Sequence, residues 1–217
     1  MRTRGIAAEL IAEKMREVFA QKGYAFFDGG KPYNVNVIGV RSPSDEANTF
    51  DDFILTIYRD DDLTMIVDSY LATTHPGKKY MRRPINVKGS AILVPGQYRG
   101  AYKIGKHRGQ YDALCQLGGP VKVWRDDNRD EVLDHAGGDL EVDDGWHGIN
   151  LHRAHPVRQL EKVNGYSAGC QVWASPTDFS EFMNICKRSA MMYGERFTYT
   201  LVDWSDLASV DRPFPVV

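Results

Sequence analysis

The strongest chemical signal in the sequence is a histidine followed eighteen positions later by a cysteine. Cys170 stands in a Ser-Ala-Gly-Cys turn, and His152 ends a short segment of alternating apolar and polar residues. A cysteine nucleophile needs a base within hydrogen-bond reach, a lowered thiol pKa and backbone N–H groups that receive the oxyanion. Gly169 permits a backbone that turns N–H groups inward, and Ser167 can hold the turn by a local hydrogen bond. These residues predict covalent catalysis by Cys170, with the oxyanion bound by N–H groups of residues 169–171.

His152 is the best candidate for the base because of its place at the end of a predicted strand. In the segment 148–152, Ile149 and Leu151 fall on one side, and Asn150 and His152 fall on the other. A strand is a rigid element that can present an imidazole in a fixed orientation. We therefore expect His152 to face the thiol.

The other two cysteines favour a structural role. Free cysteine is commonly an inert core residue. Cys115 lies between leucines on what we expect to be a short helical turn, and Cys186 lies on the apolar stripe of a predicted helix. Cys170 differs because glycine precedes it and the polar Gln171 follows it, which predicts an accessible sulfur.

Three histidines near Cys170 also raise the question of a zinc site. His147, His152 and His155 could be joined by Asp143 or Asp144 as a carboxylate ligand. On a strand, however, His152 would point away from both other histidines, and the sequence holds no His-Glu-x-x-His motif. We expect no metal and no cofactor.

The residues around Cys170 resemble the catalytic signature of the L,D-transpeptidases, the family with the YkuD-like fold, which acts on the peptide stems of peptidoglycan. The resemblance covers residues 146–173, with a histidine on a strand, a loop, and Ser-x-Gly-Cys before a hydrophobic strand. The segment 73–77, Thr-Thr-His-Pro-Gly, is similar to a Thr-Pro-x-Gly segment upstream in the family. The run Ile-Asn-Leu-His-Arg before Ser-Ala-Gly-Cys-Gln is also similar to phage-encoded relatives.

The resemblance implies that Cys170 is the nucleophile, that His152 activates it, and that Ser167 and Gly169 form the turn. It leaves the substrate contacts open, because Ala168 stands where the family often has a basic residue, and Val172 where it has arginine or asparagine. The substrate-binding residues that we expect are Arg153, His155, Gln171 and His147.

Composition and charge are those of an ordinary globular protein of 217 residues, with 42% hydrophobic residues and a formal net charge of −2. The basic residues between positions 78 and 108 are interleaved with tyrosines. They fit a groove for an acidic peptide or a solvated face, and we expect no nucleic-acid partner because the whole chain is slightly acidic.

The sequence shows neither an apolar signal-peptide region nor a run long enough to cross a bilayer. Three cysteines without framework spacing suit a reducing compartment. We expect a monomer that is cytoplasmic as synthesised, is not inserted in a membrane, and acts on the cell wall after release.

The pattern of elements predicts an α+β fold that is mainly β. An amphipathic helix is expected over residues 5–21 and a second one after Ser175, with strands between them, among them a hairpin formed by residues 121–125 and 131–133. We expect one catalytic domain over 1–217, made of a helix-and-strand extension (1–50), a core (51–205) and a tail (206–217). By the resemblance, the core is an L,D-transpeptidase-like β-sandwich.

Three functions remain open. The first is a cysteine-dependent hydrolase of peptidoglycan stems, an L,D-carboxypeptidase or endopeptidase of the endolysin or effector type, working through a thioester. The second is an L,D-transpeptidase that forms crosslinks or exchanges D-amino acids. The third is a non-catalytic virion or wall-binding module. The absence of an export signal favours the hydrolase, because a housekeeping transpeptidase must be secreted to reach the wall.

Overall fold

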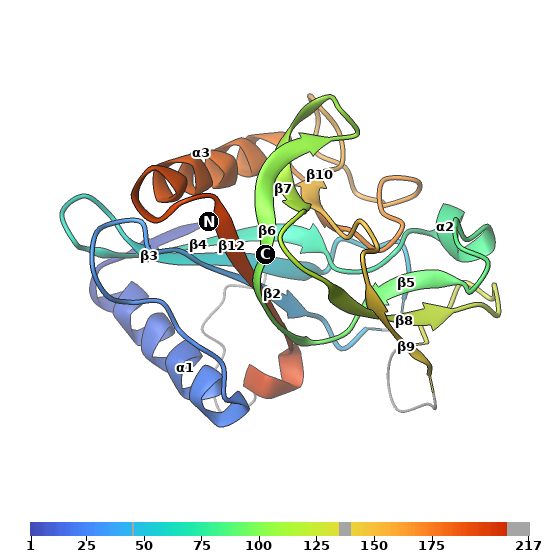
Figure 1. The fold of residues 1–217 in the computed structure, drawn as a ribbon, viewed down its shortest axis with the longest axis horizontal. Coiled ribbons are helices and arrows are strands. Elements are labelled where there is room, and N and C mark those ends of the chain that lie inside the picture. Colours follow the sequence, from blue (N-terminus) through green and yellow to red (C-terminus); the bar gives the residue numbers. More distant parts are fainter. Residues whose placement is uncertain (45, 135–139, 208–217) are drawn as a thin grey trace.

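Strands make up most of the protein in the computed structural model, which describes residues 1–44, 46–134 and 140–207 (Figure 1). In chain order the elements are β1 (Arg2–Arg4), α1 (Ile6–Lys22), β2 (Asn36–Arg41), β3 (Asp52–Arg59), β4 (Met65–Thr73), α2 (Lys78–Arg82), β5 (Ser90–Leu93), β6 (Gly96–His107), β7 (Tyr111–Gln116), β8 (Val121–Asp126), β9 (Val142–Gly145), β10 (Leu151–Arg153), β11 (Gln171–Trp173), α3 (Pro176–Tyr193), β12 (Arg196–Asp203) and the 3₁₀ helix η1 (Trp204–Leu207). The expected α+β class with mainly β-structure is confirmed.

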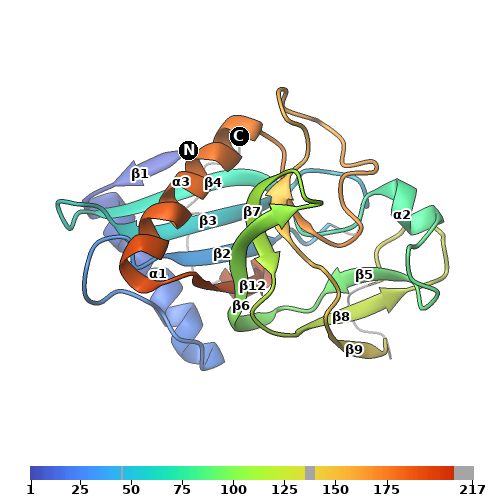
Figure 2. The same ribbon diagram turned by 45° about the horizontal axis from the view of Figure 1, so that its top comes forward.

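Nine strands form one sheet in the order β1-β4-β11-β10-β7-β6-β12-β2-β3. The additional pairing of β3 with β4 closes eight of these strands into a ring. Strand β1 lies outside the ring and pairs with the first part of β4, whereas β11 pairs with its last part. A separate sheet of β5, β8 and β9 lies beside the ring (Figure 2). Residues 146–150 connect β9 of the small sheet to β10 of the large sheet.

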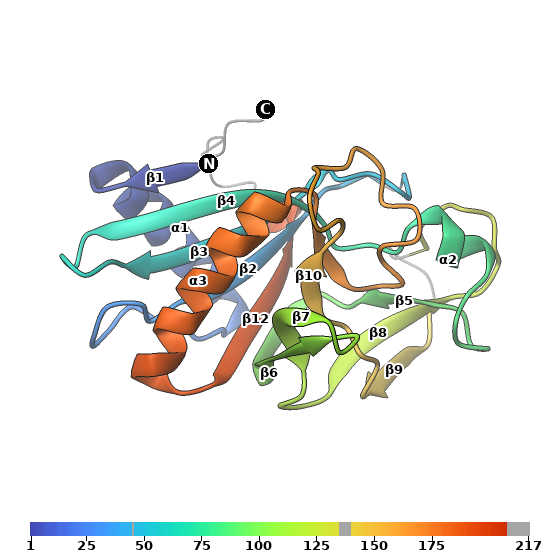
Figure 3. The same ribbon diagram turned by 90° about the horizontal axis from the view of Figure 1, so that it is seen from above.

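Side-chain alternation divides the large sheet between two cores. In β2, Val37 belongs to a core that includes Phe182 of α3, whereas its neighbour Ile38 belongs to a core that includes Phe19 of α1. Figure 3 shows α3 lying across one side of this part of the sheet, with α1 on the other. Because both faces are covered here, β2 is buried along its whole length.

Both long helices form where the sequence predicts them, with α1 one residue later than the expected 5–21 and α3 starting directly after Ser175. In α1 the left-handed Gly23 (φ 70°) ends the helix. In α3 the side chain of Ser175 accepts a hydrogen bond from the Asp178 N–H, and Pro176 occupies the first helical position. Neither they nor any other helix in the described ranges is long and apolar enough to span a bilayer.

Two local expectations were wrong. Cys115 lies in strand β7 rather than on a helical turn, because it pairs with Lys103 of β6. Strand β8 pairs with β9 instead of residues 131–133, where Val132 forms only an isolated bridge with Glu46. Most of the expected tail, 208–217, lies outside the described residues.

Of the candidate catalytic residues, His152 lies on β10 and Cys170 immediately precedes the adjacent parallel strand β11 within the ring. Leu151 of β10 is paired with Gln171 of β11, and His152 with Val172. On their outer edges, β10 contacts β7 and β11 contacts β4. This register brings the start of β11, immediately after Cys170, to the level of the histidine strand.

Candidate active site

The thiol of Cys170 lies opposite the segment that enters β10. The Gln171 N–H donates to the Asn150 carbonyl at 2.9 Å, which ties the cysteine turn to this segment. The Asn150 N–H lies 3.4 Å from the Cys170 Sγ, and the Sγ lies 3.5 Å from the Gly148 carbonyl oxygen. The thiol is therefore held by backbone groups while the residue stays half-buried rather than enclosed.

Ser167 and Gly169 shape the turn before the cysteine. The buried Ser167 hydroxyl accepts from the Gly169 N–H at 3.1 Å and donates to the Cys170 carbonyl at 2.8 Å. Gly169 has φ +119°, and a Cβ at this position would lie 2.3 Å from the Ala91 carbonyl oxygen. The turn thus needs a glycine both for its backbone conformation and for its close contact with β5.

Replacing Gly169 with alanine should destabilise the protein by on the order of 3 kcal/mol, because the substitution adds backbone strain and a collision with Ala91. Gly194→Ala is the matched control: Gly194 also has a positive φ (+84°), but no atom lies within 4 Å of the added Cβ. Urea denaturation of both variants measures the difference. Equal losses of unfolding free energy would show that the Ala91 contact does not constrain the turn.

The ring of His152 is fixed in one tautomer by its surroundings. His152 is buried, and its Nδ1 lies 2.8 Å from the Arg153 carbonyl oxygen. A carbonyl only accepts hydrogen bonds, so Nδ1 carries the proton and Nε2 is left as the basic nitrogen. The Tyr111 hydroxyl donates to the same carbonyl at 3.2 Å. In this tautomer the imidazole can receive a proton at Nε2.

A second imidazole, His107 at the end of β6, stacks on His152. The ring centroids are 3.9 Å apart and the ring planes differ by 20°. The Nδ1 of His107 accepts from the Asn150 Nδ2 at 3.2 Å, and the Asn150 Oδ1 accepts from the Gln116 N–H at 2.9 Å. Asn150 therefore contacts the thiol through its backbone and the second imidazole through its side chain. Neither Asn150 nor His107 was among the predicted site residues.

Burial keeps both the thiol and the imidazoles uncharged. It raises the pKa of the Cys170 thiol to about 11. Burial, with the neighbouring His107, lowers the pKa of His152 to about 3, and burial with the charge of Arg108 lowers the pKa of His107 to about 4. The expected lowered thiol pKa was therefore wrong for the resting protein. At neutral pH the site holds a neutral thiol and neutral imidazoles, rather than a thiolate–imidazolium pair.

The backbone donors available to an oxyanion are fewer than expected. Of the three N–H groups of residues 169–171, that of Gly169 donates to Ser167 and that of Gln171 donates to Asn150. The Cys170 N–H has no hydrogen-bond partner among the described residues. The expected oxyanion site is thereby reduced to this one N–H, because the other two are needed to hold the turn.

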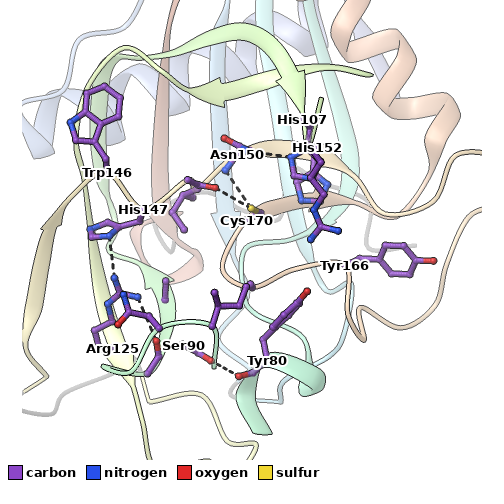
Figure 4. A pocket seen from close by; sticks show the side chains of 18 residues that line it. Tyr80, Ser90, His107, Arg125, Trp146, His147, Asn150, His152, Tyr166 and Cys170 are labelled. Atoms are coloured by element: carbon purple, nitrogen blue, oxygen red, sulfur yellow. Dashed lines mark hydrogen bonds between the residues drawn. The ribbon is translucent and has the colours of Figure 1, made fainter. Parts of the chain in front are cut away.

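Two cavities meet at the histidine pair. The first, of about 360 Å³, contains Cys170 and extends past Trp146 and His147 towards Tyr80 and Arg125 (Figure 4). The second, of about 270 Å³, lies on the side of Tyr111 and Arg153. Four residues line both: His107, Arg108, His152 and Tyr166. A ligand at the junction of the two cavities would therefore lie against His152.

Two of the four predicted substrate contacts line a cavity. His147 is in the wall of the first, where its Nδ1 accepts from the Arg125 guanidinium at 3.1 Å and its Nε2 donates to the Asp143 carbonyl at 3.0 Å. Arg153 is in the wall of the second, with its guanidinium 4.2 Å from the centre of the Tyr111 ring. Substrate binding by both residues stays a prediction.

The other two predicted contacts are placed elsewhere. Gln171 is fully buried, accepts from the Tyr199 hydroxyl at 2.8 Å and donates to the Gly169 carbonyl at 3.2 Å, so it supports the turn and does not face a ligand. His155 lines neither cavity, and its Nδ1 accepts from the N–H groups of Val157 and Arg158. It therefore stabilises the loop between β10 and β11.

The segment Thr73–Gly77 lies against the cysteine turn and the strand that follows it. Thr73 pairs with Val172 of β11, and the Gly77 N–H donates to the Ser167 carbonyl at 3.0 Å. A Cβ on Gly77 would lie 2.2 Å from the Asn164 carbonyl oxygen. This segment thus packs against the turn and supports it from the side opposite His152.

No family model matches the sequence, and no curated protein is significantly similar to it. The chemistry assigned to this site therefore rests on the geometry of the residues and on the resemblance of a single segment.

Proposed function

We propose that this protein is a cysteine-dependent hydrolase that cleaves peptide stems of peptidoglycan, with an L,D-transpeptidase-like catalytic fold. One observation carries the proposal: the Cys170 thiol, immediately before β11, and the imidazole of His152, fixed in one tautomer on the neighbouring parallel strand β10, line one cavity. The buried Ser167 and the positive φ of Gly169 hold the Ser-Ala-Gly-Cys turn in a way that suits a presented nucleophile.

In the proposed reaction, the Cys170 Sγ bonds to the carbonyl carbon of the stem while the His152 Nε2 takes the thiol proton. The carbonyl oxygen gains the negative charge and accepts a hydrogen bond from the Cys170 N–H. Collapse breaks the C–N bond, and His152 returns its proton to the departing amine. The product of this half-reaction is a thioester. General acid–base help of this kind is worth roughly 10²–10⁴-fold in rate.

Because thiol and imidazole are both neutral at rest, proton transfer would accompany attack rather than precede it. A thiol with a pKa of about 11 is almost entirely protonated at pH 7, so the fraction of Cys170 that is already a thiolate before attack is very small. His152, although a weak base in its buried state, lines the same cavity as the thiol. The mechanism thus resembles a general-base pathway more than a preformed ion pair.

The fate of the thioester distinguishes hydrolysis from transpeptidation. Water activated by His152 would release a carboxylate and regenerate the thiol. An amine would instead form a new peptide bond. The second cavity, which shares His152 with the first, favours transpeptidation as a second candidate, because it offers room for an acceptor beside the thioester.

Digestion of purified sacculi in ¹⁸O-labelled water, followed by mass spectrometry of the fragments, tests both candidates. A hydrolase should yield shortened stems with ¹⁸O in the new carboxylate. A transpeptidase, supplied with an added D-amino acid, should yield stems whose terminal residue has been exchanged and which carry no label. Unchanged stems under both conditions would reject the proposed function.

A further inference from the structure

Among the described residues, the walls of the two cavities hold no acidic side chain and include an arginine, Arg108, that makes no ion pair. Within the described part of the chain, no aspartate or glutamate lines either cavity. Arg125 in the first cavity is neutralised by Asp143, whose carboxylate accepts from its Nε at 3.0 Å and its Nη2 at 2.9 Å. The guanidinium of Arg153 lies over the Tyr111 ring. Arg108 makes no ion pair with any described residue and lines both cavities.

The backbone at Arg108 is unusual for an arginine. Arg108 and Gly109 form the tip of the β6–β7 hairpin, with φ values of +49° and +72°. Positive φ at both central residues is the pattern of a type I′ turn, for which asparagine followed by glycine is strongly preferred. An arginine in the first position is held in a conformation that L-residues disfavour. Such strain at a cavity wall is a recognised mark of a functional position.

The charge of Arg108 also acts directly on the reacting groups. It opposes the burial that raises the pKa of Cys170, and it adds to the burial that lowers the pKa of His107 and of His152. Arg108 lines both cavities together with His107 and His152, and the first cavity also together with Cys170. An anionic group bound by Arg108 would therefore lie in the same cavity as the thiol.

Resting on the proposed function, we propose that Arg108 binds a carboxylate of the stem peptide at the junction of the two cavities and so selects substrates with a free carboxylate next to the scissile bond. Guanidinium and carboxylate form charge-assisted, often bidentate, hydrogen bonds. The carboxylate can be the terminal one of the stem or that of an acidic residue within it. Both sources offer the same chemistry to Arg108.

Stem peptides amidated separately at the terminal and at the internal carboxylate distinguish these sources. The wild-type protein should turn over the fully acidic peptide with a kcat/KM about 10–100-fold higher than the peptide lacking the recognised carboxylate. Arg108→Gln should lose this preference, chiefly through a raised KM for the acidic peptide. Arg108→Lys, which keeps the charge, should retain part of it. Lys106→Gln, on the exposed side of the same hairpin and ion-paired with Asp112 at 2.7 Å, is the control and should leave the preference unchanged.

Arg108→Asn separates recognition from folding. Asparagine suits the turn better than arginine, so this variant should melt at a temperature equal to or higher than that of the wild type while losing the preference for the acidic peptide. A retained preference in Arg108→Gln or Arg108→Asn would overturn the proposal.

A binding measurement keeps this test independent of turnover. Calorimetric titration of Cys170→Ala with the acidic and amidated peptides should show tighter binding of the acidic one, and the double variant with Arg108→Gln should lose the difference. Equal binding of both peptides, or binding of neither, would overturn the role of Arg108. By contrast, a carboxylate preference in binding without turnover by the wild type would reject only the proposed hydrolysis.

Discussion

Replacing Cys170 with alanine should reduce turnover of peptidoglycan stems by at least about 10⁴-fold, because no other described group in the cavity can form the thioester. The fold should be nearly unaffected. The residue is half-buried, and its sulfur makes two long polar contacts with described residues, at 3.4 Å with the Asn150 nitrogen and at 3.5 Å with the Gly148 oxygen. Turnover of purified sacculi and the thermal melting temperature, measured on the same preparation, check both parts.

The matched control is Cys186→Ala. Cys186 is fully buried on α3 within the main core, and burial strongly raises its pKa, so its thiol takes no part in nucleophilic chemistry. Its loss should lower the unfolding free energy by roughly 1 kcal/mol and leave kcat/KM of the folded protein unchanged. Wild-type turnover by Cys170→Ala would contradict the assignment of the nucleophile, whatever the behaviour of the control.

The parts of this protein that the sequence predicted are those that depend on neighbours in the chain. The Ser-Ala-Gly-Cys turn follows from the small side chains and hydrogen-bonding hydroxyl of residues 167–170, which interact with one another. The cap of α3 likewise needs only Ser175 and Asp178, three positions apart.

The parts that were missed depend on contacts between distant segments. His107 reaches Asn150, 43 positions away, only because β7 lies between β6 and β10 in the sheet. The alternation along β6 and the Arg108-Gly109 turn are signals of a hairpin, but they do not indicate which strand lies beside it. The burial that raises the thiol pKa is a property of the assembled cavity and not of the segment around Cys170.

Gln171 shows how a correct strand can still give a wrong side-chain prediction. A polar residue beside the nucleophile suggests a ligand contact when only one face of the strand is assumed to be buried. In β11 all three residues are buried, because the strand lies between β4 and β10 with both faces covered. The amide is satisfied internally by Tyr199, which lies far away in the sequence on β12.

Replacing His152 with glutamine should lower kcat/KM by about 10³-fold at neutral pH, because the variant loses the nitrogen that accepts the thiol proton. A glutamine amide can still donate to the Arg153 carbonyl, so the local hydrogen bond and the melting temperature should be largely kept. The two measurements separate loss of the base from loss of the fold. A variant with wild-type kcat/KM would remove His152 from the mechanism.

The pH profile gives a second, independent test of the same residue. In the wild type, protonation of His152 on the acid side removes the base. Because its pKa is lowered to about 3 and that of His107 to about 4, activity should stay level down to about pH 5 and fall only below it. An unperturbed histidine would instead give a fall near pH 6.5.

In His152→Gln the acid-side fall in activity should be replaced by a tenfold rise per pH unit up to the thiol pKa of about 11, since only the free thiolate can then attack. A bell-shaped profile in that variant would mean that another described group, with His107 the nearest, serves as the base.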